Sequence, residues 1–283
     1  MNSTKGDGLT TIPSASLPFV DVMNFRAKKL LKMCKEQGIK NVVSFLINDL
    51  YYRILHRLAF PFWRSRVAQP NPKEFGVFLA SLVKTNTASV LEIGSRNNSD
   101  VTVRGSFKPP IEYVGMDILA GPNVDIIGDA HELSSLFPKE RFNGVFCISV
   151  FEHLLMPWKV VLEINTVLKT GGLVYVVTHP TWPPHELPWD FWRYQPNGFW
   201  ALFNSSTGFE LISCSTFEPS RLIPAGTGFH LGGTVKTECA MGVVALAKKI
   251  GPYDPRLAWP IKTADITSTS YPSKEINRVD ARR

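Results

Sequence analysis

The sequence has few cysteines and no long hydrophobic run. Its four cysteines stand far apart in 283 residues, which argues against a zinc site or a disulfide framework and is typical of a reducing compartment. No window of about eighteen apolar residues occurs, so no segment is expected to span a membrane. Residues 1–20 also lack the apolar core of a secretory signal. These absences predict a cytoplasmic protein, and we assign no metal ligands.

A glycine-rich phosphate-binding turn is also missing. Dinucleotide-dependent oxidoreductases carry GxGxxG after their first strand, because the pyrophosphate must approach a helix N-terminus past small residues. Here Gly94 is followed by Ser95, Arg96 and two asparagines. The pattern therefore disfavours a dinucleotide oxidoreductase.

The positive charge is concentrated in one region. The formal net charge of the chain is +7, and residues 21–66 hold ten Lys/Arg and three acidic residues, which by themselves give +7. The remainder is formally neutral, so nucleic-acid binding is not expected. Apolar residues recur at helical spacing in the same region. We expect basic helices that either cover an active site or lie on an anionic membrane.

Composition divides the chain into three regions. Residues 1–70 are expected to be an extension with a loose start and basic amphipathic helices, residues 71–250 a domain, and residues 251–283 a polar tail without fixed structure. Within the domain, apolar strands alternate with helices, which is typical of a parallel sheet covered on both faces. Expected strands are 89–93, 112–116, 124–127, 144–149, 173–178, 209–217 and 238–247, and expected helices are 72–85, 157–169 and 196–204.

Polar residues and a glycine follow four of the expected strands. Because the carboxyl ends of parallel strands meet at one edge of a sheet, we expect these residues to converge on one crevice. Gly94 allows a ligand to approach the backbone closely, and Asp117, about twenty residues later, is placed to bind ribose hydroxyls. Asp129 can accept a hydrogen bond from an adenine amine. The candidate cofactor-binding residues are Glu92, Gly94, Ser95, Arg96, Asp117, Ile118, Asp129, Ala130, Ser149 and Val150.

Five segments resemble the class I S-adenosylmethionine-dependent methyltransferases: VLEIGS, YVGMDI, DIIGDAHEL, FNGVFCISVFEHL and VLEINTVLKTGGLVYVV. The resemblance covers roughly residues 72–248, and GPNVDIIGDAHEL followed by DFWRYQPNG is similar to a bacterial subgroup associated with polysaccharide or other glycan biosynthesis. It implies a Rossmann-like α/β fold with a seven-stranded, mostly parallel sheet, helices on both faces and an antiparallel last strand. It also implies S-adenosylmethionine as the cofactor.

The chain departs from the family where Arg96 and Asn98 stand at positions usually held by glycines. Two functions therefore remain open. The first is a methyltransferase acting on a small molecule or glycan, with O-methylation as the expected reaction. The second is a non-catalytic protein that keeps the fold as a binding or scaffold module.

Transfer to a hydroxyl requires a group that removes the proton. His153, after the fourth strand, and His179, at the end of the fifth, are the candidate catalytic residues, although either could instead be structural. A proline- and tryptophan-rich loop over residues 181–197 follows, and aromatic faces with a few charges suit sugar rings. Candidate acceptor-binding residues there are His185, Asp190, Arg193 and Tyr194; Asp190 and Arg193 could instead pair with each other. The acceptor's identity and the oligomeric state remain open.

Overall fold

The computed structural model describes residues 43, 50, 54, 73–84, 87–97, 103–222 and 238–271. The chain divides into two compact units, Met1–Val67 and Ala68–Arg283. In the first unit the three described residues are helical and exposed. The remainder of the expected basic extension lies outside the described residues, as do residues 272–283 of the expected tail.

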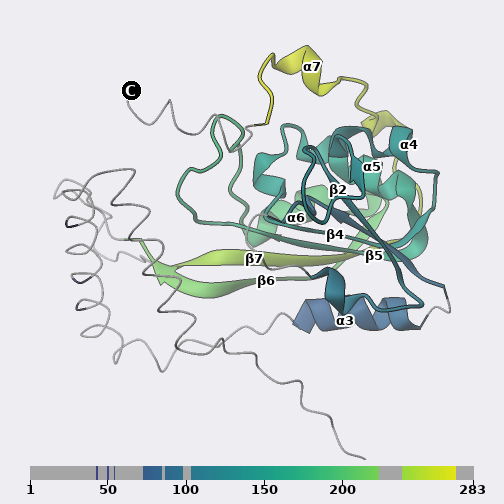
Figure 1. The fold of residues 1–283 in the computed structure, drawn as a ribbon, viewed down its shortest axis with the longest axis horizontal. Helices are drawn as coiled ribbons and strands as arrows, with labels where there is room; N and C mark the ends of the chain where they lie inside the picture. The colour runs from purple at the N-terminus through teal and green to yellow at the C-terminus, as the bar shows by residue number, and fades with distance from the viewer. Residues whose placement is uncertain are drawn as a thin grey trace, which may run out of the picture. The chain divides into compact units, whose positions relative to one another are not determined.

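Within the described part of the second unit, seven strands form one sheet (Figure 1). They are β1 (Ser89–Ile93), β2 (Glu112–Asp117), β3 (Ile126–Ile127), β4 (Phe142–Ile148), β5 (Leu168–Thr178), β6 (Phe209–Arg221) and β7 (Glu238–Lys249). Their order is β3-β2-β1-β4-β5-β7-β6; β1 to β5 are parallel, and β7 is antiparallel to both β5 and β6. The predicted Rossmann-like sheet with an antiparallel last strand is confirmed.

Helices cover both faces of the sheet (Figure 1). The covering helices are α3 (Lys73–Val83), α4 (Leu133–Leu136), α5 (Pro157–Val167) and α6 (Pro196–Leu202); the short α7 (Thr263–Ile266) lies apart from the sheet (Figure 1). Alternate strand residues point to opposite sides: Leu91 and Val145 pack with α4, α5 and α6, whereas Val90 and Phe146 pack with α3. Burial on both sides explains the continuous apolar strands. No helix in the described part has the length and apolar character needed to cross a membrane.

The end of α5 differs from the prediction. The helix stops at Val167 instead of continuing to Lys169, and Leu168 already belongs to β5. Leu168 is fully buried and pairs with Phe142 of β4. Gly171, predicted to end the helix, lies inside β5 with φ of 86°. Sheet pairing and burial of Leu168 therefore outweigh the local stop signal.

Residues 251–271, expected within a tail without fixed structure, pack onto the domain instead. Hydrogen bonds that attach them include Lys159 Nζ to Ile261 O (2.7 Å), Thr263 Oγ1 to Asp129 Oδ2 (2.9 Å) and Trp189 Nε1 to Thr269 Oγ1 (3.1 Å). The Lys159 side chain is only 7% exposed, so its ammonium group needs this partner. The segment thus reaches residues at the carboxyl edge of the sheet.

Candidate functional site

A cavity of about 540 Å³ opens at the carboxyl ends of β1, β2 and β4. The candidate cofactor-binding residues all line it: Glu92, Gly94, Ser95, Arg96, Asp117, Ile118, Asp129, Ala130, Ser149 and Val150. His153, His179 and His185 line it as well. A volume of this size is usual for a small-molecule site. The positions of these residues at the strand ends therefore predicted that they line one cavity.

The turn after β1 depends on Gly94. Its φ is 79°, and a Cβ built there would lie 2.2 Å from Cγ2 of Val150. The amides of Gly94 and Ser95 both donate to the carbonyl oxygen of Met116, at 2.8 and 3.0 Å. The turn is thus tied to β2 and packed against Val150, and only glycine fits without strain.

Glu92 is 8% exposed and forms part of the cavity wall. The Tyr113 hydroxyl donates to its carboxylate, and the Asn123 side-chain amide lies 3.0 Å from the same hydroxyl oxygen. Burial raises the pKa of Glu92 above its ordinary value, and the Tyr113 hydrogen bond only partly opposes this effect. A buried network therefore fixes this carboxyl group in place.

Arg96 binds the residue predicted to hold the ribose. Its backbone amide donates to Oδ2 of Asp117 at 3.1 Å, and its Nε lies 3.5 Å from Oδ1. The arginine stem packs over Gly121, where a Cβ would come within 2.8 Å of Cγ of Arg96. The amide of Leu119 also donates to Oδ1, at 2.9 Å. Asp117 is therefore held by the protein's own donors, while its remaining lone pairs can still accept hydroxyl groups.

Asp129 is held in the same way. Its Oδ1 accepts the His131 amide at 2.9 Å and lies 2.6 Å from Nδ1 of that ring, while Oδ2 accepts the Thr263 hydroxyl at 2.9 Å. Burial acts to raise the pKa of Asp129, but the hydrogen bonds from His131 and Thr263 outweigh it, and the pKa lies below its ordinary value. This carboxylate is thus ionised at the cavity wall.

The two candidate catalytic histidines present the same ring nitrogen to the cavity. Nδ1 of His153 lies 2.6 Å from the Trp189 carbonyl oxygen, and Nδ1 of His179 lies 3.0 Å from the Met241 carbonyl oxygen. A carbonyl oxygen only accepts, so Nδ1 donates and Nε2 carries the lone pair of the neutral ring. Nε2 of His179 lies 3.3 Å from the Ser149 hydroxyl oxygen. Each ring is therefore oriented to interact with a ligand through Nε2.

Of the four candidate acceptor-binding residues, the structure brings only His185 to the cavity. Asp190 and Arg193 form two hydrogen bonds, at 2.5 and 2.7 Å. Burial acts to raise the pKa of Asp190, but Arg193 and the His185 amide lower it to about 2. Tyr194 is 7% exposed and donates to the Phe151 carbonyl oxygen at 3.1 Å. Asp190 and Arg193 are thus paired within the loop, and Tyr194 ties the loop to the turn after β4.

Several cavity residues were not predicted: Trp182, Glu186, Trp189 and Tyr271. The Trp182 ring stacks on His179 with 4.5 Å between ring centroids, and Tyr271 meets the ring of His153 edge-on at 5.7 Å. The aromatic composition of the loop was a signal for the two tryptophans. No local pattern marks Tyr271, which comes from the segment expected to lack structure.

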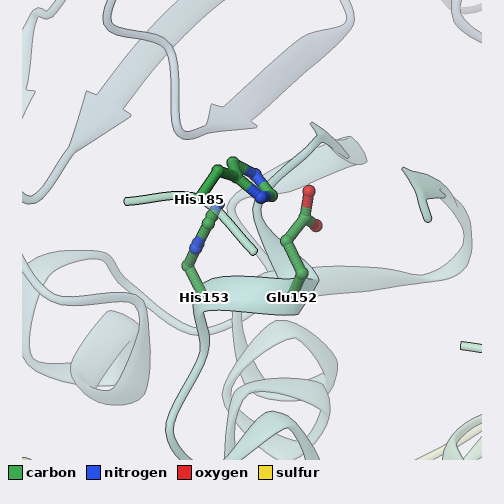
Figure 2. A group of neighbouring side chains, drawn as sticks. All are labelled: Glu152, His153 and His185. Atoms are coloured by element: carbon green, nitrogen blue, oxygen red, sulfur yellow. The ribbon is translucent and has the colours of Figure 1, made fainter. Parts of the chain in front are cut away.

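The structure also gathers a group for which no metal role was predicted. Glu152, His153 and His185 each offer one ligand atom, and these atoms lie within 4.8 Å of one another (Figure 2). The expectation of no metal site rested on cysteine spacing. Cysteine spacing carries no information about a site made of histidine and glutamate, which here meet because the loop after β5 brings His185 to Glu152 and His153.

Residues 106–176 match the family model described as a methyltransferase domain. This part of the chain is similar to methyltransferase domains. The matched part runs from just before β2 to within β5 and includes Asp117, Asp129 and His153. The match supports an enzyme that transfers methyl groups from S-adenosylmethionine, its cofactor.

Solved structures resemble the chain at low similarity. A SAM-dependent methyltransferase from Archaeoglobus fulgidus is 15% identical, with 70% of this chain and 100% of that chain covered and a TM-score of 0.43. A 1,6-didemethyltoxoflavin-N1-methyltransferase from Burkholderia thailandensis, with bound 1,6-didemethyltoxoflavin and S-adenosylhomocysteine, is 13% identical, with 75% and 90% covered and a TM-score of 0.45. Similarities as low as these give no information about the methyl acceptor of this chain. No curated protein matched the sequence.

The cavity at the carboxyl ends of β1, β2 and β4 fits a cationic sulfonium cofactor. Glu92, Asp117, Asp129 and Glu186 all line it, and Arg96 is paired with Asp117. Acidic groups around a cavity favour a cation by Coulomb attraction. Asp117 stands at the end of β2, where it can accept ribose hydroxyls through the lone pairs that Arg96 and Leu119 leave open.

Proposed function

We propose that the methyltransferase domain methylates a hydroxyl group of a small molecule or glycan. The observation that carries the proposal is the pair of histidine rings whose Nδ1 atoms donate to carbonyl oxygens, so that Nε2 of His153 and of His179 is the acceptor. A hydroxyl nucleophile loses its proton as it attacks, and neutral imidazole near pH 7 suits that proton transfer. S-adenosylmethionine, when bound, supplies an electrophilic methyl group.

His179 is the stronger candidate for the proton acceptor. Its Nε2 lies 3.3 Å from the Ser149 hydroxyl oxygen, so a hydroxyl group can come within reach of this lone pair. Its ring is held from two sides, by the Met241 carbonyl oxygen and by stacking on Trp182. A fixed ring aligns the acceptor oxygen and lowers the entropic cost of the reaction.

The surrounding side chains suit a polyhydroxylated acceptor. Trp182 and Trp189 line the cavity beside His185 and Glu186. Aromatic faces bury the apolar side of a ring, and a few polar groups orient its hydroxyls. This combination supports a sugar-like acceptor over a wholly apolar one.

Calorimetric titration with S-adenosylmethionine tests the cofactor site. We expect the wild type to bind and Asp117→Ala to bind at least about tenfold more weakly, because hydrogen bonds to a charged acceptor are lost. The matched control is Asp265→Ala, since Asp265 is exposed in α7 and does not line the cavity. Equal affinity of wild type and Asp117→Ala would reject the site, and absence of binding to the wild type would favour a scaffold protein.

The reaction is tested with labelled S-adenosylmethionine and a panel of sugars, glycans and other small molecules. We expect His179→Gln to lower the rate of methyl transfer about a hundredfold or more while cofactor affinity stays unchanged. The product's methyl carbon, observed by NMR, shows whether it is attached to oxygen, nitrogen or carbon. An N- or C-methyl product would exclude hydroxyl methylation.

A further inference from the structure

Three potential metal ligands meet beside the cavity of the methyltransferase domain (Figure 2). Glu152 and His153 are neighbours in the short helix Phe151–His153 after β4, and His185 comes from the loop after β5. Figure 2 shows Glu152 and His153 rising from the same short helix, with His185 near their tips. One carboxylate oxygen and one nitrogen of each ring lie within 4.8 Å of one another.

Both histidines have the tautomer that binds metal through Nε2. Nδ1 of His153 donates to the Trp189 carbonyl oxygen at 2.6 Å. Nδ1 of His185 lies 3.2 Å from the Pro183 carbonyl oxygen and 3.4 Å from Oδ2 of Asp190. Metal-binding histidines usually donate their other ring N–H to a carbonyl or carboxylate, which fixes the ring and raises its basicity. The partners of both rings match this arrangement.

Glu152 supplies the second, independent observation. Its side chain is fully buried, and the Thr178 hydroxyl donates to Oε2 at 2.6 Å. Among the described residues, Oε1 has no hydrogen-bond partner; Nε2 of His179 lies 3.4 Å away. A buried carboxylate oxygen without a donor is unfavourable unless a cation compensates its charge.

We propose that Glu152, His153 and His185 bind a divalent transition-metal ion such as Zn²⁺. Two imidazoles and one carboxylate form the ligand set of catalytic zinc sites, which keep a further position open. Ligands about 2.1 Å from a tetrahedral ion lie about 3.4 Å apart, so the three side chains must draw closer on binding. His185 is the member that moves, because its side chain is 30% exposed and lies on a loop.

The open position of the ion faces the cavity, because both histidines line it. An acceptor hydroxyl bound there would have a lowered pKa, and His179 would remain available to take its proton. Glu186 Oε2, which is 3.8 Å from Nε2 of His153, is close enough to contact a bound hydroxyl or the ion. This role in catalysis rests on the proposed hydroxyl methylation, whereas ion binding does not.

The test uses the full chain, stripped with a chelator and titrated with Co²⁺ by visible absorption and with Zn²⁺ by calorimetry, without cofactor or acceptor. We expect one ion per chain, and affinity at least about tenfold lower in His185→Ala and Glu152→Gln. The control is His131→Gln, because both ring nitrogens of His131 already have partners, Asp129 at 2.6 Å and the Met156 amide at 3.1 Å. Circular dichroism checks that each variant is folded.

Failure of the wild type to bind either ion would overturn the proposed site, as would equal affinity of wild type and His185→Ala. If Glu152→Gln does not fold, the loop variant His185→Ala decides alone. Methyl transfer by stripped protein that binds no Co²⁺ would overturn the metal site and leave the proposed function intact. Ion binding by a protein that yields only N- or C-methyl products would support the metal site and exclude hydroxyl methylation.

Discussion

At the scale of single residues, the acidic groups that line the cavity are held in place by protein donors. Asp117 is bound by Arg96 and Leu119, and Asp129 by His131 and Thr263. Such contacts fix each carboxylate before a ligand arrives, which lowers the ordering cost of binding. Arg96 stands where a glycine was expected, but it packs beside Asp117 and over Gly121. The cavity is therefore kept despite the larger side chain.

The buried carboxyl group of Glu92 is expected to make the free energy of unfolding depend on pH. Burial raises its pKa above the ordinary 4.5, so at pH values above about 4.5 the folded protein retains a proton that the unfolded chain has lost. The stabilisation is present below that pH and is lost as the pH rises through the folded pKa. We expect Glu92→Gln, whose amide oxygen can still accept the Tyr113 hydroxyl, to gain stability relative to wild type as the pH rises.

The measurement for Glu92 is urea unfolding of wild type and Glu92→Gln at intervals from pH 4 to pH 8. Subtracting the unfolding free energy of one protein from that of the other at each pH cancels the contribution of all other titrating groups. Parallel pH profiles would contradict the effect of burial on this carboxyl group.

At the scale of elements, the C-terminal segment completes the site that the sheet begins. It carries Thr263, which binds Asp129, and Tyr271, which lines the cavity against His153. Lys159 of α5 anchors the segment through the Ile261 carbonyl oxygen. The cavity wall therefore combines strand ends with residues far along the chain.

Two glycines in different elements predict opposite responses to alanine. At Gly94 a Cβ would meet Val150 at 2.2 Å and φ is 79°, so Gly94→Ala should destabilise the fold by about 2–4 kcal/mol. At Gly76, inside helix α3, a Cβ would meet nothing within 4 Å. Gly76→Ala should therefore stabilise by about 1 kcal/mol through helix propensity.

Guanidinium unfolding of the two alanine variants beside wild type measures both effects, and Gly76→Ala is the matched control for the substitution itself. A Gly94→Ala variant as stable as wild type would show that the turn tolerates a side chain and that its packing on Val150 is loose.

At the scale of the whole molecule, charge and compact units divide the chain at nearly the same place. Residues 21–66 carry a net +7 and the remainder is formally neutral, while the first compact unit ends at Val67. Basic residues near an anionic bilayer contribute about 1 kcal/mol each. We therefore expect the full chain to co-sediment with anionic vesicles and a chain beginning at Ala68 not to do so.

Neutral vesicles are the control for this experiment, and raising the salt concentration should release the full chain because exposed charges are screened. Equal sedimentation of the full and shortened chains would reject membrane contact through residues 21–66.

Local sequence patterns predicted most of the fold and most of the residues at the carboxyl edge of the sheet. β1 has the predicted bounds, residues 89–93, and Glu92, Asp117 and Asp129 meet because parallel strands end at one edge. Local patterns failed where distant contacts decide. Leu168 joins β5 despite the glycines that follow it, because it is buried against β4.

The sequence by itself determined the sheet, its covered faces and the residues at the strand ends, because these follow from apolar periodicity and strand polarity. Only the tertiary structure decided which polar groups of the loop after β5 face the cavity. Asp190 and Arg193 pair with each other, Tyr194 is buried, and His185 meets Glu152 and His153. Those outcomes depend on how the loop after β5 folds back over the sheet, and no local spacing encodes that path.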